Sequence, residues 1–211
     1  MATEQAEQRF DAAAYLAWEE TRAERHEHLA GEVLAMVGVR QSHNVATPNL
    51  ATALRTEPRG SRCRVFSESV KTRGEAADRF FCPDVLVTCN PRNRLTPAYV
   101  SHPLPLAQLL SQSTAAFDHG GRFAAFRKLA SLQEYVLIDI AARRVEAFRR
   151  DPENHWLLHD HAPGDSVEFA SLARWLPVEQ LLEDTGEGYQ GDQAIQAIQA
   201  KAAASPATAP R

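Results

Sequence analysis

The segment Phe80–Thr88, which we predict to form one strand, constrains the fold of this chain more than any other stretch of its sequence. Its second part, Val85–Thr88, is a β-branched apolar run of the kind found in strands that are buried on both faces. Such a strand needs neighbouring strands and cover above and below, so the run predicts a sheet at the centre of a domain. Asp84 stands at the start of this run, where a carboxylate is costly unless it meets a cation or hydrogen-bond donors.

Further strands are predicted on both sides of this run. An alternating segment, His26–Met36, predicts a hairpin that turns at Ala30–Gly31. The other expected strands are Arg64–Arg73, Leu104–Leu110, Glu134–Asp139, Arg144–Arg149, Trp156–Leu158 and Ser166–Phe169. Strands in the middle of the chain, with helices before and between them, predict a mixed α/β (α+β) sheet flanked by helices.

Capping residues and apolar periodicity predict the helices. We expect helices from Asp11 to about Arg25, from Ser42–Asn44 to about Arg55, and from Asp118 onward. Pro48 is tolerable in the second of these only near its first turn, because proline has no N–H to donate within a helix. The N-terminal part is therefore expected to hold one helix followed by the hairpin.

Length and composition predict one globular domain. The chain has 211 residues, of which 44% are hydrophobic and 24% charged, which excludes a disordered chain, a collagen or a coiled coil. We expect a single domain over residues 1–190 and a disordered low-complexity tail over residues 191–211. No apolar run approaches 18 residues and the N-terminus lacks a signal peptide, so we expect a cytoplasmic protein without membrane contact.

The net charge of −4 hides an uneven distribution. Residues 33–150 carry a net charge of +8, whereas both flanking parts are acidic. A basic middle suits a polyanion such as nucleic acid, because Lys and Arg neutralise phosphates. The alternative is ordinary solvated surface charge.

The three cysteines, Cys63, Cys82 and Cys89, include no C-x-x-C pair. An odd number without that spacing fits neither a disulfide framework nor a structural zinc site. We expect all three to be reduced thiols in or near the core.

Common catalytic templates are absent from the sequence. There is no G-x-S-x-G, G-x-x-x-x-G-K-[ST], G-x-G-x-x-G or H-E-x-x-H motif. His159 and His161 lie on one side of a predicted strand, and His26 and His28 form a second such pair. Two imidazoles without a third ligand are more often ordinary residues than a metal site.

Four polar residues in structured segments are candidates for a site: Asp84, Gln108, Arg122 and Glu32. Gln108 lies inside an apolar run, on the face that also carries Leu106, so its amide needs buried partners. Arg122 follows Gly120 and Gly121 at a point where its guanidinium can reach back to the strand ends. Glu32 follows the tight turn at Gly31.

Several motifs, taken together and in order, resemble the Uma-type family of bacterial restriction endonucleases, from about Tyr15 to about Leu182. They are Gly31-Glu32, His43-Asn44, Cys82–Val87, Leu110–Thr114, Asp118 with Arg122, and Ser131–Asp139. The resemblance implies a restriction-endonuclease-like fold with a PD-(D/E)xK-type site. In such a site two carboxylates on adjacent strand ends hold Mg²⁺, and a lysine assists attack on the phosphodiester.

The resemblance also implies roles for individual residues. Asp84 matches the family's aspartate, Gln108 lies where the family has glutamate, and Arg122 lies where it usually has lysine. We therefore expect Mg²⁺ or Mn²⁺ to be held by Asp84, Gln108 and Glu32, with Arg122 at the phosphate.

Two residues of a neighbouring predicted strand, Lys71 and Arg73, are candidate DNA contacts. Lys71 is also the nearest candidate to replace the lysine that the family usually has at the position of Arg122. The alternative is that Lys71 is an ordinary exposed surface residue. Because nucleases of this fold often pair to cut two strands, we expect a homodimer that acts on DNA.

Two functions remain open at this point. A glutamine lacks the charge of a carboxylate, and an arginine stays protonated and cannot act as a base. The chain is expected to be either a metal-dependent DNA endonuclease, weakened or inactivated by Gln108 and Arg122, or a non-catalytic protein that keeps the nuclease fold for nucleic-acid binding or oligomerisation.

Overall fold

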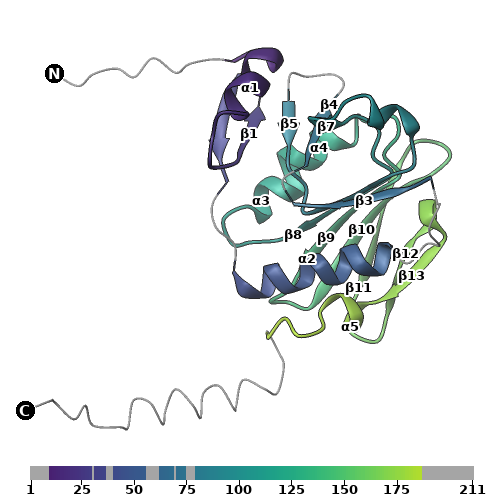
Figure 1. Cartoon of the computed structure of the whole chain (residues 1–211). Coiled ribbons are helices and arrows are strands. Elements are labelled where there is room, and N and C mark those ends of the chain that lie inside the picture. The colour runs from purple at the N-terminus through teal and green to yellow at the C-terminus, as the bar shows by residue number, and fades with distance from the viewer. Residues whose placement is uncertain are drawn as a thin grey trace, which may run out of the picture.

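The computed structural model of the chain describes residues 10–29, 31–36, 40–55, 62–68, 70–74 and 79–186. Two β-sheets and a small hairpin are arranged with helices around them (Figure 1). The expected fold class, mixed sheets flanked by helices with an N-terminal helix and hairpin, is confirmed. The predicted C-terminal tail, 191–211, lies outside the described residues.

The larger sheet has six strands and forms the centre of the molecule. In spatial order they are β11 (Trp156–His161), β10 (Arg144–Arg150), β9 (Glu134–Asp139), β8 (Pro105–Leu109), β6 (Val85–Thr88) and β3 (Arg64–Ser67). Strands β8 and β9 are parallel and the other neighbours are antiparallel, so the sheet is mixed as predicted.

The second sheet has five short strands and stands beside the first (Figure 1). In spatial order they are β2 (Glu32–Ala35), β1 (His26–Leu29), β5 (Arg79–Phe81), β4 (Lys71–Gly74) and β7 (Tyr99–Val100). A separate hairpin is formed by β12 (Ser166–Phe169) and β13 (Arg174–Pro177).

The helices are mostly short. They are α1 (Ala12–Glu19), α2 (Gln41–Leu54), α3 (Ala115–Phe117), α4 (Phe123–Phe126) and α5 (Val178–Leu181), with 3-10 turns η1 (Pro91–Arg94) and η3 (Ala170–Leu172) and a π-helical turn η2 (Asp118–Arg122). Helix α2 crosses one face of the six-stranded sheet, and α4 lies on its other face, toward the five-stranded sheet (Figure 1).

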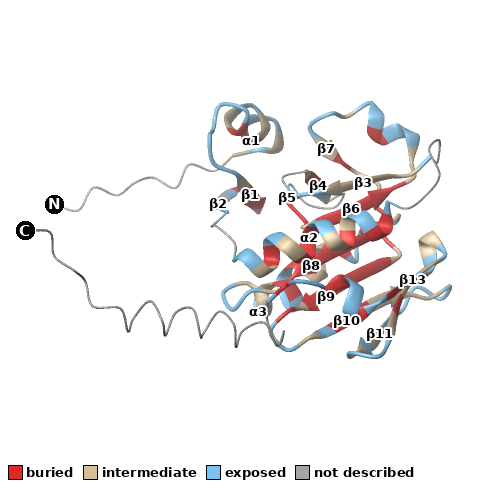
Figure 2. Cartoon of the chain, turned by 60° about the horizontal axis from the view of Figure 1, so that its bottom comes forward, coloured by how far each residue is buried: buried red, intermediate tan, exposed pale blue. Residues whose placement is uncertain are grey.

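Alternation along the central strands divides the core into two layers. In β9, Val136 and Ile138 pack into the cluster that includes α2, whereas Tyr135 and Leu137 pack into the cluster that includes Phe126 of α4. The strand is buried on both faces in the middle of the sheet (Figure 2). Its observed bounds, Glu134–Asp139, are those predicted from the sequence.

The prediction of one continuous strand over Phe80–Thr88 is wrong, because the chain passes there from one sheet to the other. β5 ends at Phe81 in the five-stranded sheet and β6 begins at Val85 in the six-stranded sheet. Pro83 cannot donate to a ladder, and the N–H of Asp84 donates to the side chain of Gln108 instead of a neighbouring strand. The two apolar halves therefore serve different sheets.

The predicted strand Arg64–Arg73 is divided in the same way into β3 and β4. Glu68, between them, has a φ of 52°, a left-handed conformation that ends the extended run. Its N–H donates to the main-chain oxygen of Asp84 at 2.9 Å, which ties this bend to the other crossing point. The local sequence, without glycine here, carries no signal for such a turn.

The helix predictions are correct in place and partly wrong in detail. Asp11 is the predicted N-cap of α1 and accepts from the N–H of Ala14 at 2.8 Å, but the helix ends at Glu19 instead of Arg25. Helix α2 begins at Gln41 without a side-chain cap, and Pro48 lies in its interior. Proline cannot donate a hydrogen bond within the helix, and the packing of the apolar face of α2 on the sheet offsets this loss.

The third helix differs from its prediction at its start. Helical structure begins at Ala115 in α3, and the predicted starting residue Asp118 opens the π-helical turn that leads into α4. The wider π-helical turn places Asp118 and Arg122 on the same buried side.

The prediction that all three cysteines are reduced is wrong for two of them. Cys63 and Cys89 form a disulfide, while Cys82 is a buried free thiol as expected. The register of β3 and β6, in which Arg64 lies opposite Thr88, brings the two cysteines that flank these strands together. Sequence spacing alone does not reveal that register.

A buried ion pair attaches α1 to the five-stranded sheet. The Lys71 ammonium on β4 lies 2.9 Å from a carboxylate oxygen of Glu19 at the end of α1. Glu19 also accepts from the main-chain N–H of His26 at 3.0 Å. Burial alone would raise the pKa of Glu19, but the hydrogen bonds from Lys71 and His26 outweigh it and lower that pKa. Lys71 is thus buried, contrary to the alternative of an exposed surface lysine.

Lys71→Ala is expected to lower the free energy of unfolding by about 3 kcal/mol, because it leaves the buried Glu19 carboxylate without its cation. Urea denaturation followed by circular dichroism measures the loss. Arg94→Ala, which removes an exposed cation, is the matched control and should change stability by less than about 0.5 kcal/mol. Equal stability of the two variants would contradict a structural role for Lys71.

Candidate functional site

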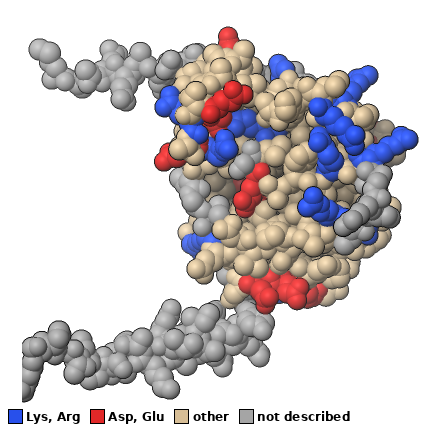
Figure 3. All heavy atoms as spheres, in the orientation of Figure 1, with Lys and Arg blue, Asp and Glu red and all other residues tan. Residues whose placement is uncertain are grey.

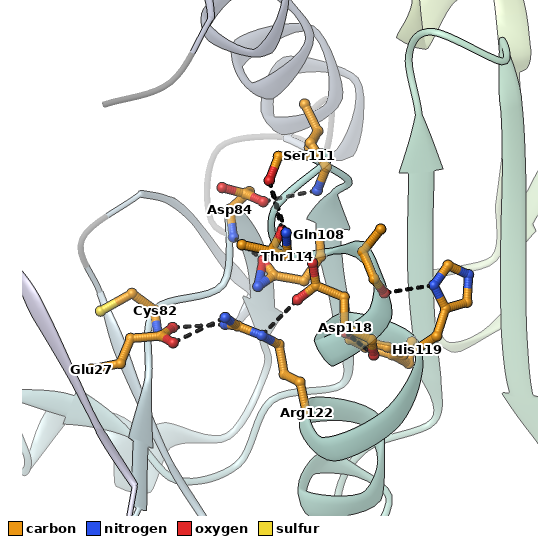
Figure 4. A network of polar contacts seen from close by, with 12 residues as sticks. Glu27, Cys82, Asp84, Gln108, Ser111, Thr114, Asp118, His119 and Arg122 are labelled. Atoms are coloured by element: carbon orange, nitrogen blue, oxygen red, sulfur yellow. Dashed lines mark hydrogen bonds and ion pairs between the residues drawn. The ribbon is translucent and has the colours of Figure 1, made fainter. Parts of the chain in front are cut away.

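Asp84 lies at the crossing point between the sheets, and hydrogen bonds fix both its backbone and its carboxylate. Its N–H donates to the side-chain oxygen of Gln108 at 2.8 Å, and its Oδ2 accepts from the N–H of Leu109 at 2.8 Å (Figure 4). These two bonds join the start of β6 to the end of β8. The contact agrees with what the family resemblance implied for Asp84 and Gln108 at adjacent strand ends.

His43, in the first turn of α2, contacts the other oxygen of the Asp84 carboxylate. Its Nε2 lies 3.2 Å from Oδ1. Burial alone would lower the pKa of His43, but the hydrogen bond and the charge of Asp84 outweigh it and raise that pKa. Both carboxylate oxygens of Asp84 thus have protein partners.

Arg122 is the cation at the centre of a buried group of charges. Its two terminal nitrogens donate to the two carboxylate oxygens of Glu27 at 2.7 and 2.9 Å, and its Nε lies 2.7 Å from Oδ1 of Asp118 (Figure 4). All three side chains are at most 8% exposed. Although burial alone would lower the pKa of Arg122, the charges of Glu27 and Asp118 raise it, so the guanidinium stays protonated.

Glu27 is the site residue that the sequence reasoning missed. Besides binding Arg122, it accepts from the N–H of Cys82 at 2.9 Å, one residue before Pro83. It alternates along β1 with His28, which stacks on Tyr15 of α1, so Glu27 occupies the opposite face. The alternation was visible in the predicted hairpin, but nothing local showed that this face would be buried against Arg122.

The other predicted site residues lie elsewhere. Glu32 is exposed on the edge strand β2, Lys71 pairs with Glu19 beneath α1, and Arg73 is exposed beside the hydroxyl of Tyr99 at 3.3 Å. Within the described residues, none of the three forms a hydrogen bond or an ion pair with Asp84, Gln108 or Arg122. The structure thus joins Asp84 to Gln108, and Arg122 to the unpredicted Glu27.

The pair formed by Asp84 and Gln108 lies next to the charged group formed by Arg122, Glu27 and Asp118 (Figure 4). Burial raises the pKa of Asp118, and the charges of Asp84 and Glu27 act in the same direction, whereas Arg122 opposes them. The site therefore couples three carboxylates and one guanidinium in an environment where unpaired charge is costly.

The residues present do not fit a Mg²⁺ or Mn²⁺ ion in this arrangement. These ions prefer carboxylate oxygens, but Asp84 has as its strand-end neighbour the neutral amide of Gln108, whose oxygen already accepts from Asp84. Both oxygens of Glu27 are bound by Arg122. Over the described ranges, no group of three or more His, Cys, Asp or Glu side chains is placed to hold a metal ion.

Comparison with known proteins identifies the class of fold. A crystal structure described as a putative nuclease belonging to DUF820, from Anabaena variabilis, superposes with a TM-score of 0.65. The match covers 82% of this chain and 97% of that chain at 18% sequence identity, so it shows a shared, nuclease-like fold. No helix within the described ranges is long and apolar enough to cross a membrane.

The family follows from sequence comparison. The model of the Uma2 family, described as "Putative restriction endonuclease", matches residues 12–179, so the chain belongs to this family. The uncharacterized Synechocystis proteins slr1290 and sll1609 are 30% identical over 158 residues and 32% identical over 149 residues. These matches cover 75% and 70% of this chain, and 83% and 84% of the two relatives. The family resemblance inferred from the motifs is thus confirmed.

Arg122→Ala is expected to lower the free energy of unfolding by about 4 kcal/mol, because it leaves two buried carboxylates without their cation. Arg122→Lys keeps one positive charge and should cost clearly less. Urea denaturation of the two variants beside the wild type tests this order. Equal stability of Arg122→Ala and the wild type would contradict the claim that Arg122 stabilises the buried carboxylates of Glu27 and Asp118.

A pH dependence is expected at His119, which lies in the π-helical turn between Asp118 and Arg122. Burial alone would lower its pKa, but bonds to the main-chain oxygen of Ala115 and to Glu146 raise it above the ordinary value of 6.5. The stabilisation by Glu146 should therefore be complete below about pH 6.5 and be lost as the pH rises through the raised pKa.

NMR titration of the His119 ring should show a lower pKa in Glu146→Gln than in the wild type. The stability difference between the two proteins should shrink as the pH rises. An unchanged His119 pKa in the variant would contradict the pairing with Glu146.

Proposed function

We propose that this chain binds DNA through its phosphate backbone, and that its site as it stands does not support metal-dependent cleavage. One observation carries the second part of this proposal: among the described residues, the side chain that meets Asp84 at the adjacent strand end is the neutral amide of Gln108. The nearby carboxylate of Glu27 is taken by Arg122. The fold is that of a nuclease, while the arrangement of charges is not that of a two-carboxylate metal site.

The chemistry of the two substituted positions supports this conclusion. A metal-dependent nuclease uses carboxylates to hold the ion and a further group to assist the attacking water. Gln108 supplies no charge, and Arg122 is protonated and bound on three nitrogens by Glu27 and Asp118. Neither residue is free for the role that its family position implies.

A group of arginines supports DNA binding. Arg64 at the start of β3 donates to the main-chain oxygen of Asn93 at 3.3 Å, which places it beside η1 with its exposed Arg92 and Arg94. We call Arg64, Arg92 and Arg94 the η1 arginines. Basic side chains gather at the upper right of the face in Figure 3, over the region where η1 lies in Figure 1. Guanidinium groups so placed suit contacts with phosphates.

Removing two of these charges, in Arg92→Ala with Arg94→Ala, is expected to weaken binding of duplex DNA about tenfold in low salt. The slope of log affinity against log salt should fall by about two, one unit for each lost phosphate contact. Fluorescence anisotropy of a labelled duplex measures both quantities.

The matched control is Arg22→Ala with Arg25→Ala, which removes two exposed charges just after α1. It should leave duplex binding close to that of the wild type. Equal salt slopes for the wild type and the η1 variant would show that these arginines do not contact phosphate.

Metal binding should appear only when both family positions are restored. We expect calorimetry to show no binding of Mn²⁺ or Mg²⁺ by the wild type and measurable binding by Gln108→Glu with Arg122→Lys, since this variant adds a carboxylate beside Asp84 and weakens the hold on Glu27. Binding by the wild type that is lost in Asp84→Ala would contradict the proposed loss of the metal site. The homodimer expected from the family stays a prediction, which light scattering tests.

A further inference from the structure

A basic hollow lies between the end of α4 and the turn that joins β10 to β11. It is a shallow depression of about 670 Å³ that is open to solvent. It is lined by Arg127, Lys128, Ala130, Arg150, Asn154 and Trp156. The lining thus contains three cations and an indole, and no carboxylate.

Arg150 and Trp156 form the fixed wall of the hollow. A terminal nitrogen of Arg150 donates to the main-chain oxygens of Arg127 and Leu129 at 2.7 and 2.9 Å, which caps the end of α4. Its guanidinium lies 4.9 Å from the centre of the Trp156 ring. The indole in turn packs edge-on against Phe123 at 5.4 Å, so the flat groups are held in place by the core.

Arg127 and Lys128 supply the unsatisfied charge. Both side chains are exposed, and neither forms an ion pair with any of the described residues. An anion that enters the hollow therefore meets positive charge without a competing carboxylate in the lining.

The hollow is separate from the Asp84 site because it lies at the other end of the sheet. Gln108 is near the ends of the parallel strands β8 and β9, opposite Leu137. At the opposite end of β9, its first residue, Glu134, pairs with Arg149 of β10. Arg150 is the next residue and the last of β10. The length of β9 thus separates the two sites.

We propose that this hollow binds a nucleotide unit, with the phosphate at Arg127 and Lys128 and the base against the Trp156 and Arg150 wall. A flat aromatic and guanidinium surface favours stacking of any base, and the adjacent cations favour its phosphate. The unit is either a free nucleotide or an unpaired nucleotide of a single strand, because duplex DNA keeps its bases stacked inside. The proposal does not depend on the function proposed for the Asp84 site.

Calorimetry with the full chain tests the site with four probes: adenosine monophosphate, adenosine, inorganic phosphate and a short single-stranded oligonucleotide. We expect a nucleotide unit, as the monophosphate or within the oligonucleotide, to bind at least tenfold more tightly than adenosine or phosphate. Arg127→Ala with Lys128→Ala should weaken that binding at least tenfold, and Trp156→Leu should weaken it more than Trp156→Phe. Arg22→Ala with Arg25→Ala removes the same amount of exposed charge just after α1 and should leave adenosine monophosphate binding unchanged.

The outcomes separate the possible sources of the ligand. Binding of adenosine monophosphate as tight as that of the oligonucleotide supports a free nucleotide, and binding of the oligonucleotide alone, lost in the Arg127 and Lys128 variant, supports a single strand. Absence of binding by both, or binding that the Arg127 and Lys128 variant leaves unchanged, would overturn the proposal. Phosphate that binds as tightly as the nucleotide would overturn recognition of the base.

Discussion

The contact of the Arg122 guanidinium with the carboxylates of Glu27 and Asp118 is the interaction on which the arrangement of this protein depends. Glu27 belongs to the five-stranded sheet, and Arg122 and Asp118 belong to the π-helical turn beside the six-stranded sheet. Because all three groups are buried, each carboxylate needs the charge of Arg122, and Arg122 in turn needs the carboxylates. The same contact holds Cys82, through Glu27, at the point where the chain passes between the sheets. The Arg122 contact therefore determines both how the two sheets are held together and how the charges of the site are balanced.

Gln108 and Arg122 stand at the two positions where the family resemblance implies glutamate and lysine, and both form contacts that hold the fold together. The oxygen of Gln108 accepts from the N–H of Asp84, a bond that a glutamate oxygen at this position would accept equally well. Arginine in place of lysine keeps the positive charge and binds Glu27 with two nitrogens. In the function that we propose, Gln108 and Arg122 keep the contacts that build the site but do not supply the second negative charge and the free amine of a metal-dependent nuclease.

Local patterns in the sequence were sufficient for those features that depend on near neighbours. The bounds of β9 and the Asp11 cap follow from periodicity and capping. The meeting of Asp84 with Gln108 joins distant segments and was implied by the family resemblance. Features that depend on pairing between distant segments were not predictable in this way. The division of Phe80–Thr88 between two sheets, the disulfide between Cys63 and Cys89, and the burial of Glu27 and Lys71 all result from strand register. A single sequence carries little information on that register.

The most direct test of this account is cleavage of supercoiled plasmid with Mn²⁺ or Mg²⁺ by the wild type and by Gln108→Glu with Arg122→Lys. Adding Asp84→Ala to the restored variant is the matched control for a contaminating nuclease. The account predicts that the wild type leaves the plasmid supercoiled, that the restored variant nicks it, and that Asp84→Ala abolishes this nicking. Nicking by the wild type that disappears in the single variant Asp84→Ala would contradict it, because the site would then cleave with glutamine and arginine in place.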